Sequence, residues 1–374
     1  MLPFVSIIIP CRNEEKFIGK CLDSIIAQDY PKDRLEVLVV DGMSEDGTRE
    51  IVERYTDMSL RARSLACHCE QSEAISARDK LRNLGIATSL PALAMTLKLL
   101  NNPKKVTPCA LNIGIKNAKG EIILWMSAHS RYEKDYISKC VKYLKEYDAD
   151  NVGGVMITLP RDNAFIGKAI ATVLSNPFGV GNSIFRTGAK EPKWVDTVFG
   201  GCYKREVFEK IGLFNENLIN SQDMEFNLRL KKAGGKILLV PDIVNYYYTR
   251  SEFKSFCKNN FRNGVWAILP FKFSKIMPVS LRHLIPLIFI LSLLGTGISS
   301  FFFLPLRWLF LDIMGLYALT NLYFSLKVAL KKKSIKYLFV TPILFTCLHL
   351  GYGLGSVWGG VRLFFPAKRE GLNG

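Results

Sequence analysis

Residues 5–15 read VSIIIPCRNEE, and residues 35–48 read LEVLVVDGMSEDGT. In each stretch an apolar run of strand length ends in polar side chains. The residues after the first run, Glu15 to Gln28, have the periodicity of an amphipathic helix, and Thr48 to Tyr55 is a second helix. Alternation of strands and helices predicts an α/β fold with a doubly wound sheet, whose ligands bind at the carboxyl ends of the strands.

The alternation is interrupted once. It resumes with a strand at Leu97–Leu100, a helix at Thr107–Ala118 and a strand at Glu121–Met126. The intervening residues 58–96 begin MSLRARSLACHCEQ, end LPALAMT, and do not continue the pattern. A long loop without structure of its own is uncommon in a compact domain. We therefore predict that residues 58–96 are a surface insertion without a catalytic role.

Polar residues directly after the strands are the first candidates for a site. Arg12 and Glu14 follow the first strand, and Asp41 ends the second, where a carboxylate can accept hydrogen bonds from a nucleoside. The helix that follows Asp41 offers backbone N–H groups to an anion. For Ser44 and Asp46 the alternative is structural, because both can form a turn and cap that helix. The chain has neither GxGxxG nor GxxxxGK[ST], so nothing supports a dinucleotide oxidoreductase or a P-loop enzyme.

The motifs IIIPCRNEE and VVDGMSEDGT resemble those of family 2 glycosyltransferases with the GT-A fold. The resemblance extends through ALNIGIKNAKGEIILWMSAHS, VDTVFGGCYKREVFEKIGLFNE, NSQDMEFNLRLKKAGGKI, FRNGVW and HLGYGLGSVWGG. Within the family it is most similar to the membrane-bound succinoglycan-biosynthesis type, which adds glucose to a lipid-linked oligosaccharide. The resemblance implies a GT-A nucleotide-sugar-binding domain with a doubly wound mixed sheet, followed by C-terminal transmembrane helices.

The resemblance also implies roles for single residues. Asp223 matches the family's catalytic base, which takes the proton from the acceptor hydroxyl, and Asn220 or Ser221 can cap its helix. For Glu225 an ion pair with Arg229, four residues on, is the alternative to a site role. The residues expected to contact the nucleotide sugar are Pro10, Arg12, Glu14, Asp41, Ser44, Asp46, Ser127, His129, Gly200, Gly201, Gln222 and Arg262.

Gly200, Gly201 and Arg262 also have specific alternatives. A glycine at Gly200 or Gly201 lets the backbone approach a sugar, but a tight turn needs glycine equally. Arg262 stands where relatives carry a Gln-x-x-Arg motif, which implies contact with the diphosphate or the acceptor. An amphipathic helix from Glu252 to Ala267, lying on a bilayer, is the alternative and is compatible with that role.

The sequence departs from the family after the strand that ends at Met126. The family usually has Asp-x-Asp there, holding a divalent metal on the donor diphosphate, whereas this chain has Ser127-Ala128-His129. His129 can ligate a metal through a ring nitrogen. We therefore expect a divalent metal cofactor, Mg²⁺ or Mn²⁺, with His129 as its ligand; a structural histidine is the alternative.

The net charge of +17 is concentrated in the last third of the chain. Residues 251–374 hold 15 basic and three acidic residues, or 15 − 3 = +12. These bases punctuate long uncharged runs instead of forming a cluster, which indicates a membrane protein and not a nucleic-acid binder. Segments 283–306, 308–326 and 337–361 are of membrane-spanning length, and the third is rich in glycine, so it either re-enters the membrane or packs tightly on its neighbours.

The lysines between the second and third segments, with the family resemblance, predict a multi-pass protein of the bacterial inner membrane whose catalytic domain is cytoplasmic. We expect the domain at residues 1–250, an amphipathic membrane-interface segment at 251–281, and a transmembrane region of two to three spans at 282–374.

The expected function is that of an inverting glycosyltransferase, which moves a hexose from a nucleotide sugar, UDP-linked, to a polyprenyl-linked saccharide in exopolysaccharide or cell-surface glycan synthesis. Its expected partners are the donor, the lipid-linked acceptor, the membrane and other polysaccharide-synthesis enzymes. Two alternatives remain: a polyprenyl-phosphate sugar synthase, and a catalytically silent membrane-anchored relative.

Overall fold

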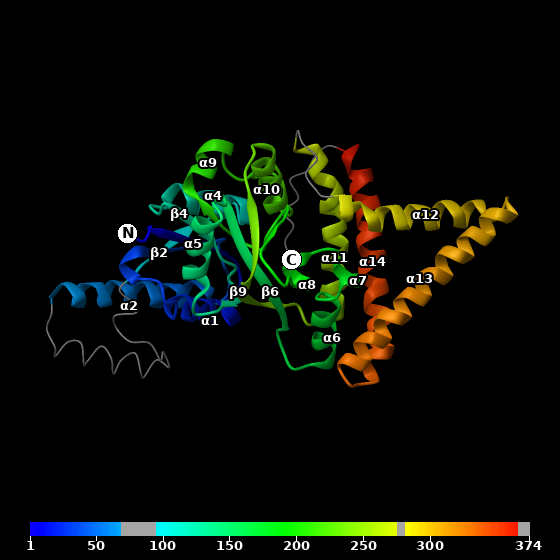
Figure 1. The fold of residues 1–374 in the computed structure, drawn as a ribbon, viewed down its shortest axis with the longest axis horizontal. Helices are drawn as coiled ribbons and strands as arrows, with labels where there is room; N and C mark the ends of the chain where they lie inside the picture. Colours follow the sequence, from blue (N-terminus) through cyan, green and yellow to red (C-terminus); the bar gives the residue numbers. More distant parts are fainter. Residues whose placement is uncertain (69–94, 275–280, 366–374) are drawn as a thin grey trace. The chain divides into compact units, whose positions relative to one another are not determined.

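The computed structural model describes residues 1–68, 95–274 and 281–365, shown in Figure 1. The chain forms two compact units. The first comprises Met1–Ile157 and Gly188–Tyr247, and the second comprises Thr158–Thr187 and Tyr248–Gly374. Nothing in the sequence pattern places residues 158–187 with the C-terminal helices.

The first unit is built on a mixed β-sheet. Among the described residues the sheet has nine strands in the order β3-β2-β1-β4-β8-β6-β9-β5, with β7 paired to β9. Strands β3, β2, β1 and β4 are parallel, whereas β8 is antiparallel to β4 and to β6. The strands are β1 Val5–Cys11, β2 Leu35–Asp41, β3 Thr96–Asn101, β4 Ile122–Trp125, β5 Ser130–Tyr132, β6 Asn151–Pro160, β7 Lys193–Trp194, β8 Gly201–Lys204 and β9 Ile237–Thr249.

Apolar runs explain why the central strands form. Every residue of β2 is buried, as expected for a strand of a parallel sheet that is covered on both faces. Helices of the first unit supply apolar faces to the same core, and α1 buries Phe17, Ile18, Cys21 and Leu22. These helices are α1 Glu15–Ile26, α2 Thr48–His68, α4 Thr107–Asn117, α5 Tyr136–Glu146, α9 Arg205–Ile211 and α10 Gln222–Lys232, with a short 3₁₀ turn at Lys32–Arg34.

The strands and helices predicted up to residue 126 are present, with ends that differ by one or two residues in most cases. The exception is α2, which continues past Tyr55 to His68 and so runs into the predicted insertion. Residues 69–94, most of that insertion, lie outside the described residues.

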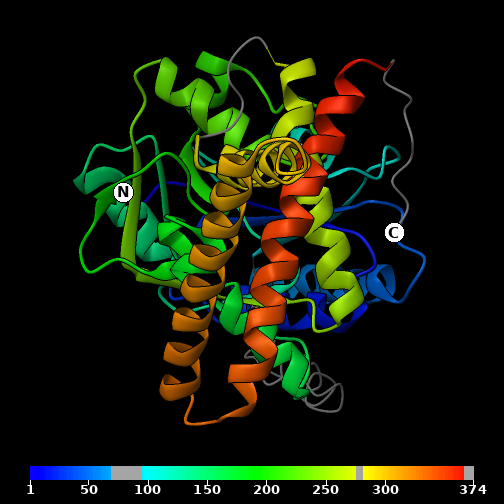
Figure 2. The ribbon, with the colours of Figure 1, turned by 90° about the vertical axis from the view of Figure 1, so that its right-hand side faces the viewer.

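The second unit is helical. Three of its helices are long and apolar enough to cross a membrane: Arg282–Ser299, Leu304–Lys331 and Lys336–Leu363. Figure 2 looks along the first of these, and Figure 1 shows α13 and α14 converging toward the loop that joins them. The helices are α6 Phe165–Val173, α7 Pro177–Val180, α8 Ile184–Thr187, α11 Phe253–Ile268, α12 Ile285–Ser299, α13 Leu304–Lys331 and α14 Lys336–Leu363, with 3₁₀ turns at Leu269–Lys272 and Leu281–Leu284.

The glycine-rich third segment is one unbroken helix, α14, packed along α11. A side chain at Gly355 would collide with the Phe261 carbonyl, and one at Gly264 would collide with the Tyr352 carbonyl. Small residues thus let the two backbones approach closely, as in membrane helix pairs. Of the two alternatives for this segment, the structure shows the tight packing, and the helix is long enough for a full crossing.

Candidate active site

Four loops meet at one edge of the sheet because of strand direction. Cys11 and Asp41 are register partners at the ends of β1 and β2, and Ile8 pairs with Trp125 at the end of β4. Strand β8 runs the opposite way, so its first residue, Gly201, pairs with Trp125. The loops after β1, β2 and β4 and the loop before β8 therefore leave the sheet on the same side. The sequence predicts site residues in all four of them.

The loop after β2 is organised around the carboxylate of Asp41, which is 1% exposed. The Ser44 hydroxyl donates to Asp41 Oδ1 at 2.5 Å, and the Ser44 N–H donates to Oδ2 at 3.2 Å. Arg49 on α2 lies 3.6 Å from the same carboxylate. Ser44 also accepts the Asn13 N–H at 3.0 Å, which ties this loop to the loop after β1. Ser44 thus holds Asp41 in place.

Asp46 caps α2. Its Oδ1 accepts the Thr48 N–H at 3.0 Å, and its Oδ2 accepts the Glu15 N–H at 3.2 Å. Partial burial opposes ionisation of Asp46, but the hydrogen bonds from Thr48 and Glu15 outweigh it and lower the pKa of this carboxyl. Asp46 therefore has the helix-capping role that was the structural alternative for it, because these bonds satisfy N–H groups at the start of α2 and α1.

The loop after β1 contacts the loop after β4 through one pair of side chains. Glu14 Oε1 lies 2.9 Å from Nδ1 of His129, and these side chains are 15% and 25% exposed. The His129 ring also packs edge-on against Tyr247 of β9, with ring centroids 4.8 Å apart. Arg12 precedes Glu14 by two residues, and its guanidinium lies 3.6 Å from the carboxylate of Glu45 in the loop after β2. Pro10 pairs with Val40 within the sheet and shapes the end of β1.

The residues at this edge offer a limited set of metal ligands. Among the described residues, no group of three or more His, Cys, Asp and Glu side chains is placed to hold an ion. What the chain offers is His129 with its Nδ1 bound to the Glu14 carboxylate. Proteins use a carboxylate on one ring nitrogen to orient a histidine toward a metal. Mg²⁺ takes oxygen ligands from one or two carboxylates, substrate phosphates and water, so the Glu14 carboxylate beside His129 supplies only part of such a ligand set. Ser127, which replaces the family's acid, contributes backbone atoms to the loop: its N–H donates to the Tyr132 hydroxyl at 2.6 Å.

Asp223 stands in the first turn of α10. Burial raises the pKa of its carboxyl above the usual value of 3.8, although backbone N–H groups of Met224 and Asp223 itself oppose the shift. Gln222, the first residue of the helix, is buried. Ser221 precedes the helix with a left-handed backbone at φ 63° and makes no capping side-chain hydrogen bond, so the predicted side-chain cap by Ser221 is wrong.

Glu225 has a structural role. Its carboxylate is 5% exposed and accepts hydrogen bonds from Arg229, from Nε at 2.7 Å and from Nη2 at 3.1 Å. Arg229 in turn donates to the carbonyls of Ile211 and Leu213 at 2.5 and 2.8 Å. The pair predicted from the i,i+4 spacing is therefore present, but it is buried and joins α10 to the end of α9.

A buried network that the sequence did not indicate connects α10 to the glycines before β8. The Tyr203 hydroxyl lies 3.1 Å from Asn227 Oδ1 and 3.4 Å from the Gly200 carbonyl. Asn227 is four residues after Asp223, on the same side of α10. Burial, followed by the charge of Asp223, raises the pKa of Tyr203. Tyr203 therefore joins α10, the helix that carries Asp223, to the glycine loop. Its signal in the sequence, a tyrosine inside an apolar strand, is too common to be recognised.

Gly200 and Gly201 are required by the backbone. Gly200 has φ +69°, and a Cβ added to it would lie 2.6 Å from the Trp125 carbonyl oxygen. Gly201 has φ +124°, and its Cβ would meet the Tyr203 ring at 2.5 Å. The alternative of a tight turn thus accounts for both glycines without a sugar. Arg262 belongs to the second unit, where it donates to Asn259 Oδ1 at 3.2 Å along α11.

Comparisons with known proteins agree with this fold. The sequence profile described as "Glycosyl transferase family 2" matches residues 6–81 and 95–212. A Methanococcus voltae enzyme, dolichyl N-acetyl-alpha-D-glucosaminyl phosphate 3-beta-D-2,3-diacetamido-2,3-dideoxy-beta-D-glucuronosyltransferase, is 32% identical over 70% of this chain and 72% of its own length. The succinoglycan biosynthesis protein ExoA of Rhizobium meliloti is 26% identical over 75% of this chain and 74% of its own length. A mannosyltransferase of Pyrobaculum calidifontis, solved with GDP-Man and Mn²⁺, superposes with a TM-score of 0.57 at 20% identity, over 96% of this chain and 88% of its own, and confirms the GT-A fold.

Proposed function

Because the chain belongs to glycosyl transferase family 2, we propose that it is an inverting enzyme that moves a hexose from a UDP-sugar to a polyprenyl-linked saccharide. The product would enter exopolysaccharide or cell-surface glycan synthesis. The lipid-linked acceptor is supported by the Methanococcus voltae relative, whose name describes transfer to a dolichyl-phosphate-linked sugar. Three helices of membrane-crossing length in the same chain support an acceptor that lies in a bilayer.

The observation that carries the proposal is the environment of Asp223. Its carboxyl lies in the first turn of α10, burial raises its pKa, and Tyr203 links that helix to the glycine loop at the site edge. A general base works best when its pKa lies close to the working pH, so a raised pKa makes a carboxylate a stronger base. We therefore assign to Asp223 the role of the base that accepts the proton.

The reaction follows from that assignment. Asp223 takes the proton of an acceptor hydroxyl while the hydroxyl oxygen attacks the anomeric carbon of the donor sugar. The new carbon–oxygen bond forms on the face opposite the breaking bond to the diphosphate. The nucleoside diphosphate leaves with the bonding electron pair, and the anomeric configuration inverts. One displacement of this kind needs only one carboxylate base.

The nucleotide portion of the donor has a separate part of the edge. Asp41, held by Ser44 and Arg49, would accept hydrogen bonds from the base or ribose, and Arg12 would contact the phosphates. His129, oriented by Glu14, would hold a Mg²⁺ or Mn²⁺ ion, which supplies positive charge to the departing diphosphate. Arg262 is proposed as a further contact to the diphosphate or acceptor.

The proposed location is the cytoplasmic side of a plasma membrane. Lys331, Lys332, Lys333 and Lys336 surround the α13–α14 loop, and loops rich in lysine stay on the cytoplasmic side. The same side holds the pool of nucleotide sugars on which the proposed reaction draws.

The proposal is tested with membranes that contain the full chain. They are incubated with a panel of labelled nucleotide sugars, and label is measured in the extracted lipid fraction. We expect one donor, a UDP-hexose, to label lipid, and Asp223→Asn to abolish labelling. Asp33→Asn, which changes a carboxylate that is 81% exposed, is the matched control and should label normally.

Two results would contradict the proposal. No labelling with any donor, together with no nucleotide-sugar binding by calorimetry, would indicate a silent relative. Normal labelling by Asp223→Asn would show that no hydroxyl is deprotonated by this residue and would favour transfer to a lipid phosphate.

A further inference from the structure

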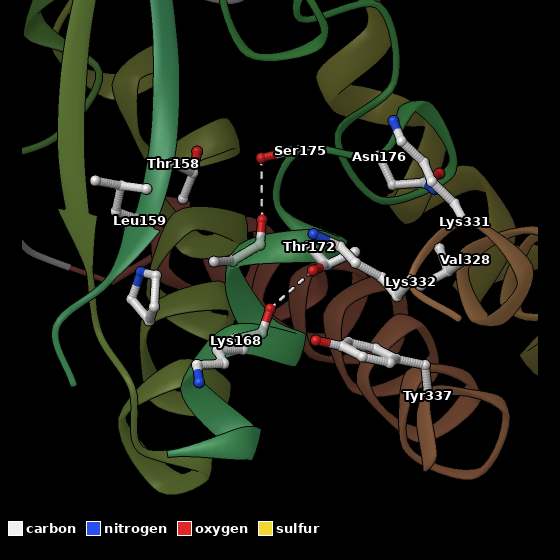
Figure 3. Close-up of a pocket in the computed structure, with 12 residues that line it drawn as sticks. Thr158, Leu159, Lys168, Thr172, Ser175, Asn176, Val328, Lys331, Lys332 and Tyr337 are labelled. Carbon is white, nitrogen blue, oxygen red and sulfur yellow. Dashed lines mark hydrogen bonds between the residues drawn. The ribbon is translucent and has the colours of Figure 1, made fainter. Parts of the chain in front are cut away.

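The second unit contains a cavity of about 310 Å³ that the proposed transfer reaction does not use. Figure 3 shows its walls: the end of β6 and helix α6 on one side, and the junction of α13 and α14 on the other. All of its lining residues belong to this unit. The cavity volume falls in the range of small-ligand sites, at the low end of about 300–1,000 Å³.

The cavity is positively charged. Lys168 comes from α6, whereas Lys331 and Lys332 come from the end of α13. The described residues that line it include no aspartate or glutamate. Three ammonium groups without a lining carboxylate make a site that attracts an anion. Membrane topology alone explains the lysines of the α13–α14 loop. It does not explain why a lysine of α6 lines the same cavity as they do.

A buried hydroxyl in the same wall is an independent sign of a ligand. Thr158 is 8% exposed, and its Oγ1 has no hydrogen-bond partner within the described structure. Two other lining hydroxyls, Thr172 in α6 and Ser175 just after it, are committed to the α6 backbone: Thr172 donates to the Lys168 carbonyl at 2.8 Å, and Ser175 donates to the Ala171 carbonyl at 3.0 Å. A buried hydroxyl without a partner is costly, so a bound group that accepts its hydrogen bond would be favoured.

The remaining wall is apolar and lies at the end of two candidate membrane spans. Leu159, Pro160, Val328 and the ring of Tyr337 line it, and Tyr337 packs against Phe165 at 4.9 Å between ring centroids. Because α13 ends at Lys331 and α14 begins at Lys336, this level corresponds to the headgroup region of a bilayer. Basic pockets between membrane helices are where proteins bind lipid headgroups.

We propose that this cavity binds the phosphate headgroup of an anionic membrane lipid. The lysines Lys168, Lys331 and Lys332 neutralise the phosphate, Thr158 donates a hydrogen bond to it, and the apolar wall contacts the start of the lipid chains. The proposal is independent of the transfer reaction. A bound lipid would join α6, which lies far from the C-terminal helices in sequence, to the α13–α14 junction.

The test is a titration of the purified full chain in detergent, followed by native mass spectrometry. Phosphatidylglycerol is the probe, with phosphatidylcholine, inorganic phosphate and a synthetic polyprenyl phosphate as parallel arms. We expect one molecule of phosphatidylglycerol to remain bound to the chain. Added salt should weaken this binding. The double variant Lys331→Gln/Lys332→Gln should bind it roughly 30-fold more weakly. The matched control Lys333→Gln/Lys336→Gln removes the same charge from the same loop outside the cavity and should bind as the native chain does.

Thr158 provides a second test. Thr158→Val keeps the shape but removes the hydroxyl, and should weaken lipid binding about fivefold, whereas Thr158→Ser should not. Equal losses in the two lysine double variants would overturn the proposal, since they would show attraction by loop charge alone. Retention of phosphatidylcholine as strong as that of phosphatidylglycerol would also overturn it. Displacement of the lipid by millimolar inorganic phosphate would show that the cavity binds free anions. Stronger binding of polyprenyl phosphate than of phosphatidylglycerol would show that it binds the lipid carrier. Either result would overturn the proposal that an anionic membrane lipid occupies the cavity.

Discussion

Glu14 Oε1 lies 2.9 Å from Nδ1 of His129, although 115 residues separate the two in the chain. The contact joins the loop after β1 to the loop after β4 at the edge where Asp41 and Gly200 also lie. It brings together a residue of the predicted nucleotide loop and the residue predicted to ligate the metal.

This contact predicts how the chain binds a divalent ion. In the presence of a nucleoside diphosphate, His129→Ala should lower Mn²⁺ affinity at least tenfold, and Glu14→Gln should lower it by about tenfold because the imidazole loses its orienting partner. Ser127→Asp, which restores the family's acid, should raise the affinity. Isothermal titration calorimetry measures all three. Unchanged Mn²⁺ binding by His129→Ala would leave His129 a structural residue.

The environment of Asp223 predicts the acid limb of the pH–rate profile. Burial raises the pKa of this carboxyl, and a base must be deprotonated to act. Activity should therefore fall, as pH is lowered, at a higher pH than about 3.9, the value for an unperturbed aspartate. The measurement is kcat against pH with a saturating donor. An acid limb at or below the ordinary aspartate value would exclude Asp223 as the base.

The same pKa shift predicts the stability of Asp223→Asn. A folded-state pKa above the unfolded value means that burial penalises the charged carboxylate, so the native chain loses stability as pH rises from the unfolded pKa through the raised one. The asparagine variant has no such charge. It should unfold at a higher temperature than the native chain at pH 7, and the difference should disappear near pH 3. Thermal unfolding at both pH values is the check; equal midpoints at pH 7 would contradict it.

The buried phenol of Tyr203 predicts a combined loss of stability and turnover. Tyr203→Phe removes the group shared by Asn227 and the Gly200 carbonyl, and should lower the free energy of unfolding by about 1–3 kcal/mol. Because α10 carries Asp223, kcat should fall while the donor KM stays nearly constant. Tyr143→Phe removes a phenol that binds Asp242 at the surface and serves as the control, with little change in either quantity. A loss of stability without a change in kcat would limit Tyr203 to a structural role.

Gly200 predicts a penalty that can be separated into two parts. Gly200→Ala forces a side chain into a left-handed backbone and against the Trp125 carbonyl. Gly188 has φ +91° with nothing within 4 Å of an added Cβ, so Gly188→Ala isolates the backbone penalty of about 1–2 kcal/mol. Chemical denaturation should show a clearly larger loss for Gly200→Ala than for Gly188→Ala. Equal losses would mean that the loop before β8 moves to accommodate the methyl group.

Much of the first unit could be predicted because its signals are local. The runs at residues 5–11 and 35–41 are apolar over the length of a strand, and the apolar face of α1 repeats with the period of a helix. The family follows from the same stretches, and the profile match confirms it. The membrane-crossing helices are equally local, since length and composition define them.

Other features could not be predicted because they depend on distant contacts. Ser221 was expected as one of two possible side-chain caps on α10, but it adopts a left-handed backbone there and its side chain makes no cap bond. The bond between Tyr203 and Asn227 joins a strand to a helix 24 residues away. The roles assigned to the site residues remain predictions until the variants above are measured.

By itself, the sequence determined the order of strands and helices, the family, the three apolar helices and the candidate residues at the strand ends, because hydrophobic periodicity and motif spacing are properties of neighbouring residues. Only the tertiary structure decided that Glu14 meets His129, that Asp223 lies partly buried with a raised pKa, and that residues 158–187 pack with the C-terminal helices around a lysine-lined cavity. Each of these depends on burial and on contacts between segments far apart in the chain, which exist only once the chain has folded.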